Sequence, residues 1–193
     1  MANDMNGHRD FAGASPAPPV RQDYHIGQIN TSGQFSDSSI GFHAPLSDQD
    51  ADKYWLDVFT KVDQSPATLY LFVLTKSEAS KDVLATSQIH IIPKATHQHR
   101  AEIAKLLVHP SARRRGIATA MMKFVEKFAR DDLQRAMLNL DTVTEAAALD
   151  FYRWTGWTEW GTCPDYAEFA DGRRGSITFS VKFLRERSRR PVE

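Results

Sequence analysis

The sequence has little of several features that define common protein classes. Of its 193 residues only Cys163 is a cysteine, so no disulfide forms within the chain, and a reducing, cytoplasmic compartment fits best. No apolar run approaches the length of a membrane-spanning helix. Net charge is also lacking, because 24 basic residues balance 24 acidic ones. This balance argues against a chain built to coat nucleic acid or an anionic membrane, so we expect no partner of either kind.

Both ends of the chain lack the apolar periodicity of packed helices and strands. Residues 1–38 are rich in Gly, Ala, Ser, Pro and Asn and carry no apolar core of a signal peptide, so we expect a disordered or loosely attached segment. Residues 186–193 form a basic tail that we expect to be solvated. One domain over residues 39–185 remains, which is long enough for a hydrophobic core.

Between these ends, apolar periodicity and turn residues predict a mixed α/β domain. Helices are expected at residues 47–62, at 116–130 and after residue 142, the last one running to Thr155 and ended by Gly156. Strands are expected at residues 68–75, 83–92, 101–108, 136–142, 157–162 and 176–184, the first two as an antiparallel pair. This order predicts an α/β (α+β) mixed sheet with a strand–helix–strand crossover in its middle.

Three finer features accompany this pattern. Thr142 and Glu145 have the spacing of a capping box at the start of the third helix. A loop containing Pro164, Asp171 and Gly172 is expected to join the last two strands. The buried stripe of the second helix is expected to consist of Ile117, Met121, Phe124, Val125 and Phe128.

The strand at residues 101–108 has a flaw in its alternation. Ala101 and Ile103 share one parity, whereas Leu106 and Val108 share the other. A strand that changes parity indicates a β-bulge, here near Ala104–Lys105. Such a bulge would splay the strand from its neighbour and leave backbone groups unpaired.

The segment HPSARRRGIATAMM, residues 109–122, lies between this strand and the second helix. The free N–H groups and the dipole of a helix N-terminus attract anions. Gly116 and Ala118 are small enough to let a phosphate approach the backbone, and Arg113, Arg114 and Arg115 add charge at the rim. A solvated charge run and a nucleic-acid patch are the other readings of three arginines. A Walker phosphate loop and a dinucleotide fingerprint are both absent.

These residues resemble the acyl-CoA-binding motif of the GNAT superfamily of acetyltransferases. The pattern [QR]-x-x-G-x-[GA] is met by Arg113, Gly116 and Ala118, and the preceding strand ends in V-x-P at Val108 and Pro110. Downstream, ALDFYRWTGW (residues 148–157) is similar to the superfamily's helix that carries a tyrosine near the thiol, followed by a glycine-aromatic turn.

A larger part of the chain, roughly residues 40–184, is similar to the tabtoxin-resistance branch of this superfamily. The pieces that carry this likeness are IGFHAPLSD, AEIAKLLVHPSAR, LNLDT and DFY, with Pro164, Tyr166 and residues 171–173. GNAT domains normally begin with a strand and a long helix. Residues 24–39 of this chain leave little room for them, so we expect the first helix to be missing or shortened.

The resemblance implies the GNAT fold with a bulged central strand, and acetyl-CoA as the acetyl donor with no metal. The residues then expected to hold acetyl-CoA are Leu107, Val108, Arg113, Arg114, Arg115, Gly116, Ile117, Ala118 and Thr119. The expected acceptor is the amine of a small, amino-acid-like toxin or metabolite. A protein or peptide acceptor, and a degenerate domain that only binds acyl-CoA, are the alternatives, and a monomer and a homodimer are both left open.

Acetylation by direct attack of a neutral amine needs no covalent enzyme intermediate. A backbone N–H near Leu107 or Val108, freed by the splayed strand, is expected to polarise the thioester carbonyl. By resemblance, Tyr152 is the general acid for the leaving thiolate. Glu102 and Asp141 are the candidate bases for the acceptor ammonium. Two readings stay open beside these: Glu102 only fixes the ammonium by its charge, and Asp141 helps to cap the following helix.

Overall fold

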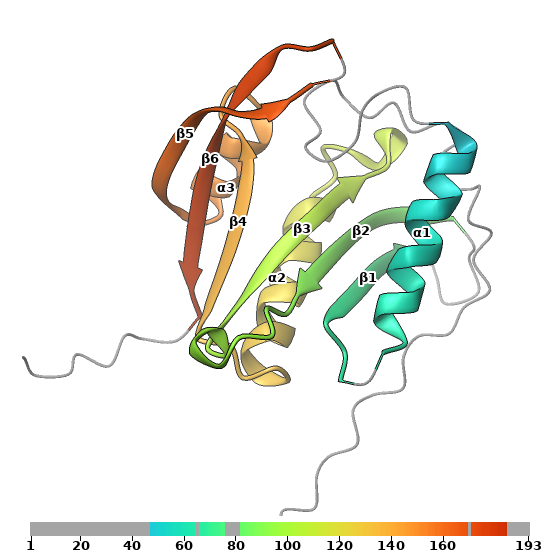
Figure 1. The fold of residues 1–193 in the computed structure, drawn as a ribbon, viewed down its shortest axis with the longest axis vertical. Coiled ribbons are helices and arrows are strands. Elements are labelled where there is room, and N and C mark those ends of the chain that lie inside the picture. Colours follow the sequence, from blue (N-terminus) through green and yellow to red (C-terminus); the bar gives the residue numbers. More distant parts are fainter. Residues whose placement is uncertain (1–46, 65, 76–81, 170, 185–193) are drawn as a thin grey trace, which may run out of the picture.

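The computed structural model describes residues 47–64, 66–75, 82–169 and 171–184 (Figure 1). Its helices and strands, in chain order, are α1 (Asp48–Val62), β1 (Leu69–Thr75), β2 (Val83–His90), β3 (Arg100–Val108), α2 (Ile117–Asp131), β4 (Met137–Val143), α3 (Ala147–Trp154), β5 (Thr158–Glu168) and β6 (Arg174–Phe183). This order is the predicted one. The expectations for residues 1–38, for a shortened first helix and for the tail at 186–193 concern residues outside this description.

The strands form one mixed sheet in the order β1-β2-β3-β4-β6-β5. The pairs β1–β2 and β2–β3 are antiparallel, as are β4–β6 and β6–β5. β3 and β4 are parallel and are joined through α2, so the predicted strand–helix–strand crossover is confirmed. The fold class is therefore a mixed α/β sheet, as the sequence predicts.

Helices cover the two faces of the sheet unequally (Figure 1). On one face, α2 packs Met121, Met122 and Val125 against buried residues of the strands such as Ile89 and Ile103. On the other, α1 packs on β1 through a smaller cluster of Trp55, Val58 and Leu69. We call this second side the α1 face. Because side chains alternate along a strand, polar residues of β2, β3 and β4 that are not in the α2 core point to the α1 face.

Two of the three finer predictions differ from the structure at the ends of the sheet. Thr142 does not cap α3, because it is buried within β4, directly opposite Thr178 of β6. The N-cap of α3 is Ala146, which makes no side-chain capping hydrogen bond. The predicted loop around Pro164 is largely strand, since β5 continues to Glu168 and pairs with β6. Proline is tolerated there because β5 is an edge strand.

The third, the stripe of α2, is correct in part. Met121 and Val125 are buried as expected, and Ile117 and Phe128 are half-buried against the same core. Phe124 is 60% exposed, although its ring meets Phe72 edge-on at 5.9 Å. Among the described residues no helix is both long and apolar enough to cross a membrane.

Candidate active site

The predicted bulge in β3 is present and sits near the middle of the sheet. The register pairs on either side of it are Thr86–Leu107 and Gln88–Ala104, so β3 has one more residue than β2 between them. Lys105 occupies the bulge with a φ of 52°, a left-handed conformation that costs energy in any residue except glycine. A bulge at this point changes the direction of the second half of β3.

β3 pairs with β4 only over its first three residues, and this pairing ends at Glu102, before the bulge. The register pairs are Arg100 with Met137, Ala101 with Leu138 and Glu102 with Asn139. After these pairs the two strands diverge (Figure 1). The His109 N–H donates to the Leu84 carbonyl at 2.8 Å, so by alternation the N–H of Val108 points away from β2. This amide, rather than that of Leu107, therefore faces the side on which β4 has separated.

The arginine-rich segment forms a tight turn into α2. Gly116 is the N-cap, in a left-handed conformation with a φ of 77°, and Arg114 is also left-handed at 58°. The first intrahelical bond runs from the Ala120 N–H to the Gly116 carbonyl at 3.0 Å, so the N–H groups of residues 117–119 have no acceptor within the helix. No acidic residue lies in this first turn. The turn thus fits an anion such as the pyrophosphate of a coenzyme A.

Arg113 connects this turn to the end of β3. Its Nε donates to the carbonyl oxygen of Val108 at 3.1 Å, while the side chains of Arg113, Arg114 and Arg115 are exposed. The structure therefore brings together all the residues expected to hold acetyl-CoA: Leu107 and Val108 at the strand end, Arg113 to Arg115 in the turn, and Gly116, Ile117, Ala118 and Thr119 at the start of the helix.

Tyr152 lies on α3 and is only 8% exposed. Its ring packs edge-on against Trp157 at 5.9 Å and against Phe151 at 5.4 Å. Burial raises the pKa of Tyr152 to about 12, and the negative charge of Asp141 contributes to this rise. The phenol is therefore protonated over the whole ordinary pH range, and Asp141 is close enough for its charge to act on it.

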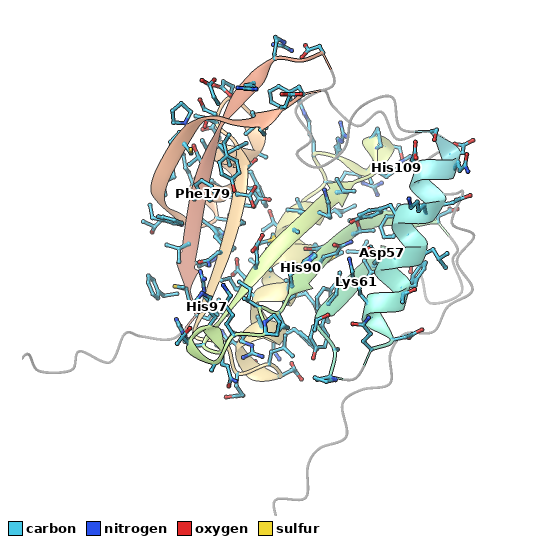
Figure 2. All side chains as sticks on the ribbon, in the orientation of Figure 1. Asp57, Lys61, His90, His97, His109 and Phe179 are labelled. Carbon is cyan, nitrogen blue, oxygen red and sulfur yellow. The ribbon has the colours of Figure 1, made fainter. Side chains whose placement is uncertain are left out.

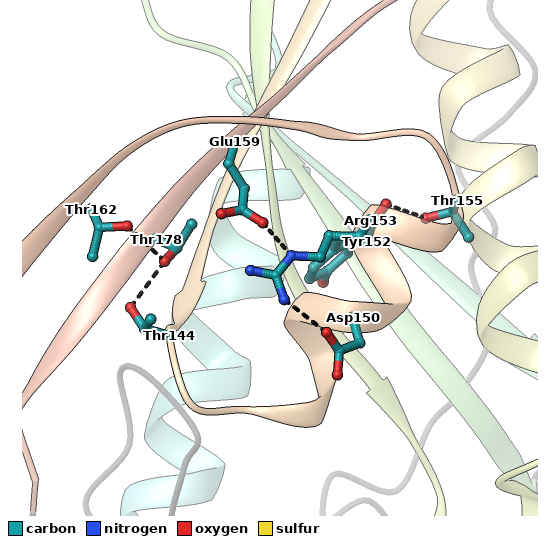
Figure 3. Close-up of polar contacts among 8 residues, drawn as sticks. All are labelled: Thr144, Asp150, Tyr152, Arg153, Thr155, Glu159, Thr162 and Thr178. Atoms are coloured by element: carbon teal, nitrogen blue, oxygen red, sulfur yellow. Dashed lines mark hydrogen bonds and ion pairs between the residues drawn. The ribbon is translucent and has the colours of Figure 1, made fainter.

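Polar contacts around α3 hold the helix in place (Figure 3). Arg153 forms an ion pair with Asp150 at 2.8 Å and another with Glu159 at the start of β5. The hydroxyl of Thr155 donates to the Tyr152 carbonyl at 3.1 Å. These contacts tie the last turn of α3 to the start of β5, while the Tyr152 ring itself packs against Phe151 and Trp157.

The two candidate bases lie on the α1 face and are half-buried. Burial raises the pKa of Glu102, as does the charge of Asp141, while Arg100 opposes the rise. Burial also raises the pKa of Asp141, and the ammonium of Lys105 opposes it. Asp141 does not cap α3, since the N-cap, Ala146, has no side-chain partner. Among the described residues, no three His, Cys, Asp or Glu side chains are grouped so as to hold a metal ion.

A second set of polar residues lies on the same face and was not predicted from the sequence. His90 lies directly across from Glu102 in the β2–β3 register, and Gln88 precedes it by two residues. His90 Nε2 lies 3.0 Å from Gln88 Oε1, and Gln88 Nε2 donates to Tyr54 Oη on α1 at 2.9 Å. The available signal was weak: Gln88 and His90 lie on either side of the apolar Ile89, but Ser87 breaks the alternation before them.

Aromatic side chains flank Asp141 on its other side and were also missed. Phe179 of β6 is the register partner of Asp141, and Figure 2 marks it on the sheet. The centroid of its ring lies 5.5 Å from that of Trp160 and 5.3 Å from that of Tyr166. Trp160 and Tyr166 are 64% and 58% exposed. The carboxylates thus stand between a polar group on β2 and an exposed aromatic surface on β5 and β6.

A model of the acetyltransferase (GNAT) family matches residues 36–157 of the chain. The match spans the bulged strand, the anion-binding turn and Tyr152. The protein belongs to the GNAT acetyltransferase family, whose members use acetyl-CoA as co-substrate.

Solved structures with the same fold have different acceptors in their names. A spermidine N-acetyltransferase from Vibrio cholerae is 18% identical with a TM-score of 0.57, the alignment covering 72% of this chain and 76% of that one. A ribosomal-protein-alanine N-acetyltransferase from Brucella melitensis is 18% identical with a TM-score of 0.56, covering 72% and 79%. A candidate phosphinothricin N-acetyltransferase is 19% identical with a TM-score of 0.60, covering 74% and 84%. At these identities the likeness shows the fold alone.

Proposed function

We propose that the protein transfers the acetyl group of acetyl-CoA to the amine of a small, amino-acid-like molecule. The observation that carries this proposal is the divergence of β3 from β4. The Val108 amide and the turn before α2 lie at the end of the diverging strand, and Glu102 and Asp141 lie beside the point where the strands part. A donor site and an acceptor site therefore adjoin one opening in the sheet.

On the donor side, the backbone supplies most of the contacts. The N–H groups of residues 117–119 take the pyrophosphate of acetyl-CoA, and the absence of a side chain at Gly116 lets it approach. Arg114 and Arg115 add charge at the rim. Leu107 and Val108 lie along the arm that leads to the thioester. The compact turn and its lack of acidic groups support these roles.

On the acceptor side, a carboxylate and Tyr152 carry the proton transfers, and a backbone amide stabilises the developing charge. Glu102 or Asp141 takes the first proton from the acceptor ammonium, which leaves a neutral amine to attack the thioester carbonyl. The Val108 N–H stabilises the negative charge that develops on the carbonyl oxygen. As the carbon–sulfur bond breaks, Tyr152 donates its proton to the leaving thiolate and regains one from the nitrogen of the new amide, directly or through water.

The small amine acceptor rests on three supports. The chain is similar to the tabtoxin-resistance branch of the family over roughly residues 40–184. Two structures of the same fold carry spermidine and phosphinothricin, both small amines, in their names. The half-buried carboxylates suit a cationic amine. The protein has a single cysteine, which is typical of a reducing compartment such as the cytoplasm. There the enzyme would act as a monomer or homodimer.

The N-terminal amine of a peptide is the second candidate acceptor. The segment after Cys163, expected to be a loop, is instead a strand that extends the sheet as far as Glu168. A strand in the plane of the sheet encloses an acceptor less than a loop folded over the site, and this favours a longer substrate.

The test combines binding and turnover. Calorimetry measures acetyl-CoA binding to the full chain, and mass spectrometry follows acetyl transfer to amino acids, polyamines and short peptides. Acetylation of small amines in preference to peptides supports the proposal. Acetyl-CoA binding with peptide acetylation alone supports the second candidate, and binding without transfer to any amine contradicts both.

A further inference from the structure

A hydrogen-bonded chain of three side chains crosses from α1 to the edge of the candidate acceptor site. Tyr54 Oη accepts from Gln88 Nε2 at 2.9 Å, and Gln88 Oε1 lies 3.0 Å from His90 Nε2. Gln88 is only 1% exposed, so it pays a large desolvation cost unless both ends of its amide are satisfied. In the structure the amide nitrogen faces Tyr54 and the carbonyl oxygen faces His90.

That orientation determines the tautomer of His90. With its nitrogen turned to Tyr54, Gln88 presents a carbonyl oxygen to the imidazole, and an oxygen can only accept. The proton of a neutral His90 must then reside on Nε2, which leaves the lone pair of Nδ1 as an acceptor.

The charged groups around His90 keep the imidazole neutral. Burial lowers its pKa, and the positive charges of Lys61 and Lys105 lower it further. Lys61 extends from α1, where it forms an ion pair with Asp57 at 2.6 Å (Figure 2). From β3, Glu102 stands in register with His90, and its own pKa is raised. A histidine in these surroundings accepts hydrogen bonds at neutral pH instead of carrying a charge.

The register of the sheet places His90 beside the candidate base. His90, Glu102 and Asn139 are consecutive partners across β2, β3 and β4, so their side chains share the α1 face. This row lies at the last β3–β4 pair, immediately before the strands diverge. An amine bound next to Glu102 therefore lies close to the His90 imidazole, whose Nδ1 carries a lone pair.

We propose that His90 is an acceptor-binding residue, whose Nδ1 accepts an N–H of the acceptor nitrogen beside Glu102, and that Gln88 and Tyr54 are positioning residues that hold this tautomer. The inference rests on the proposed function. The proton count is unchanged by it: Glu102 takes the first proton from the ammonium, and the hydrogen bond to His90 orients the remaining N–H groups. The nitrogen lone pair is then left free to attack the carbonyl.

The tautomer can be tested without any turnover. Long-range ¹H–¹⁵N NMR of the full chain, with the His90 signal assigned by its loss in His90→Phe, reports which imidazole nitrogen carries the proton. We expect a neutral Nε2–H form at pH 7 that shifts towards a mixture in Gln88→Leu. A protonated Nδ1, or a tautomer that is insensitive to Gln88→Leu, overturns the inference whether or not the protein acetylates amines.

Kinetics then tests the contact with the acceptor. A glutamine at position 90 keeps an N–H donor for the Gln88 carbonyl but has no acceptor where His90 has Nδ1. An asparagine at position 90 places an oxygen acceptor at that position. We expect His90→Gln and His90→Phe to raise the acceptor KM about tenfold, the effect of losing a hydrogen bond to a charged group. His90→Asn should recover part of this loss, and the KM for acetyl-CoA should not change.

A matched control is the exposed His99, which precedes β3. His99→Phe should leave both KM values as they are. An unchanged acceptor KM in His90→Phe overturns the inference while leaving the proposed function intact. Failure of the wild-type chain to transfer acetyl groups contradicts the proposed function. The NMR experiment still tests the His90 tautomer in that case, because it needs no turnover.

Discussion

Arg113 Nε donates a hydrogen bond of 3.1 Å to the carbonyl oxygen of Val108, which ties the arginine-rich turn to the end of the bulged strand. Of the three arginines, this one thus has a defined contact inside the protein as well as a charge to offer. Lysine keeps the charge but has no N–H at the Nε position. We expect Arg113→Lys to weaken acetyl-CoA binding about tenfold by calorimetry.

Arg114→Lys is the control for this change, because its side chain is exposed and keeps its charge. It should leave the dissociation constant within about twofold. Equal effects of the two substitutions would mean that only charge matters at the rim, and that the contact to Val108 does not shape the donor site.

Gly116 allows a separate test of the backbone approach to the phosphate. Its φ of 77° strains any residue with a Cβ, yet a Cβ built there meets nothing within 4 Å. Gly116→Ala should therefore cost about 1–2 kcal/mol of stability from conformation alone, measured by chemical denaturation. It should also weaken acetyl-CoA binding, and Gly116→Glu should abolish it, because a carboxylate then occupies the anion site.

Gly156 is the matched control, with a φ of 84° and an equally open surrounding at the end of α3. Gly156→Ala should lose similar stability and keep its affinity for acetyl-CoA. If both alanine variants bind equally well, the proposed approach of the phosphate to Gly116 is wrong.

The sequence predicted those parts of the site that depend on local patterns. The parity change in residues 101–108 indicated the bulge now seen at Lys105, and a glycine between a strand and an apolar stripe indicated the start of α2. Such features arise from neighbours within a few residues. The family motif then identified Tyr152, whose burial could not be derived from its spacing alone.

The wrong and missing predictions concern features that depend on tertiary contacts. Thr142 and Glu145 have the spacing of a capping box, but pairing with β6 continues β4 past Thr142 and moves the helix start to Ala147. His90 reaches Glu102 through strand register, and Gln88 reaches Tyr54 across 34 positions of the chain. No local pattern specifies such contacts, so the interactions of His90 and Gln88 could be found only from the fold.

Tyr152→Phe should separate chemistry from binding. Removing the hydroxyl removes the proton for the leaving thiolate, so kcat should fall about 10²–10⁴-fold, while calorimetry should show unchanged acetyl-CoA affinity. Because the pKa of Tyr152 is about 12, the wild-type rate should show no alkaline loss from this group at any pH up to about 10. Tyr70→Phe, on the α2 side of the sheet, is the control and should keep its rate. Full turnover of Tyr152→Phe at every pH rules out the general-acid role.

The raised pKa of Glu102 predicts an opposite effect of one substitution on stability and on activity. A carboxyl with a higher pKa in the folded than in the unfolded chain binds its proton more tightly when folded, so the free energy of unfolding falls as the pH rises through the folded pKa. Glu102→Gln removes this loss. We expect a higher Tm than wild type at pH 7–8 and no difference below about pH 4, where the unfolded carboxyl is protonated as well.

The same substitution should lower acetyl transfer, because glutamine accepts no proton from the acceptor ammonium. Glu145→Gln, at an exposed position before α3, is the control and should change neither the Tm difference across pH nor the rate. A Glu102→Gln variant that is less stable than wild type at pH 8 contradicts the desolvation argument. One that is more stable and fully active leaves Asp141 as the base, since the two carboxylates share the same face and influence each other's charge.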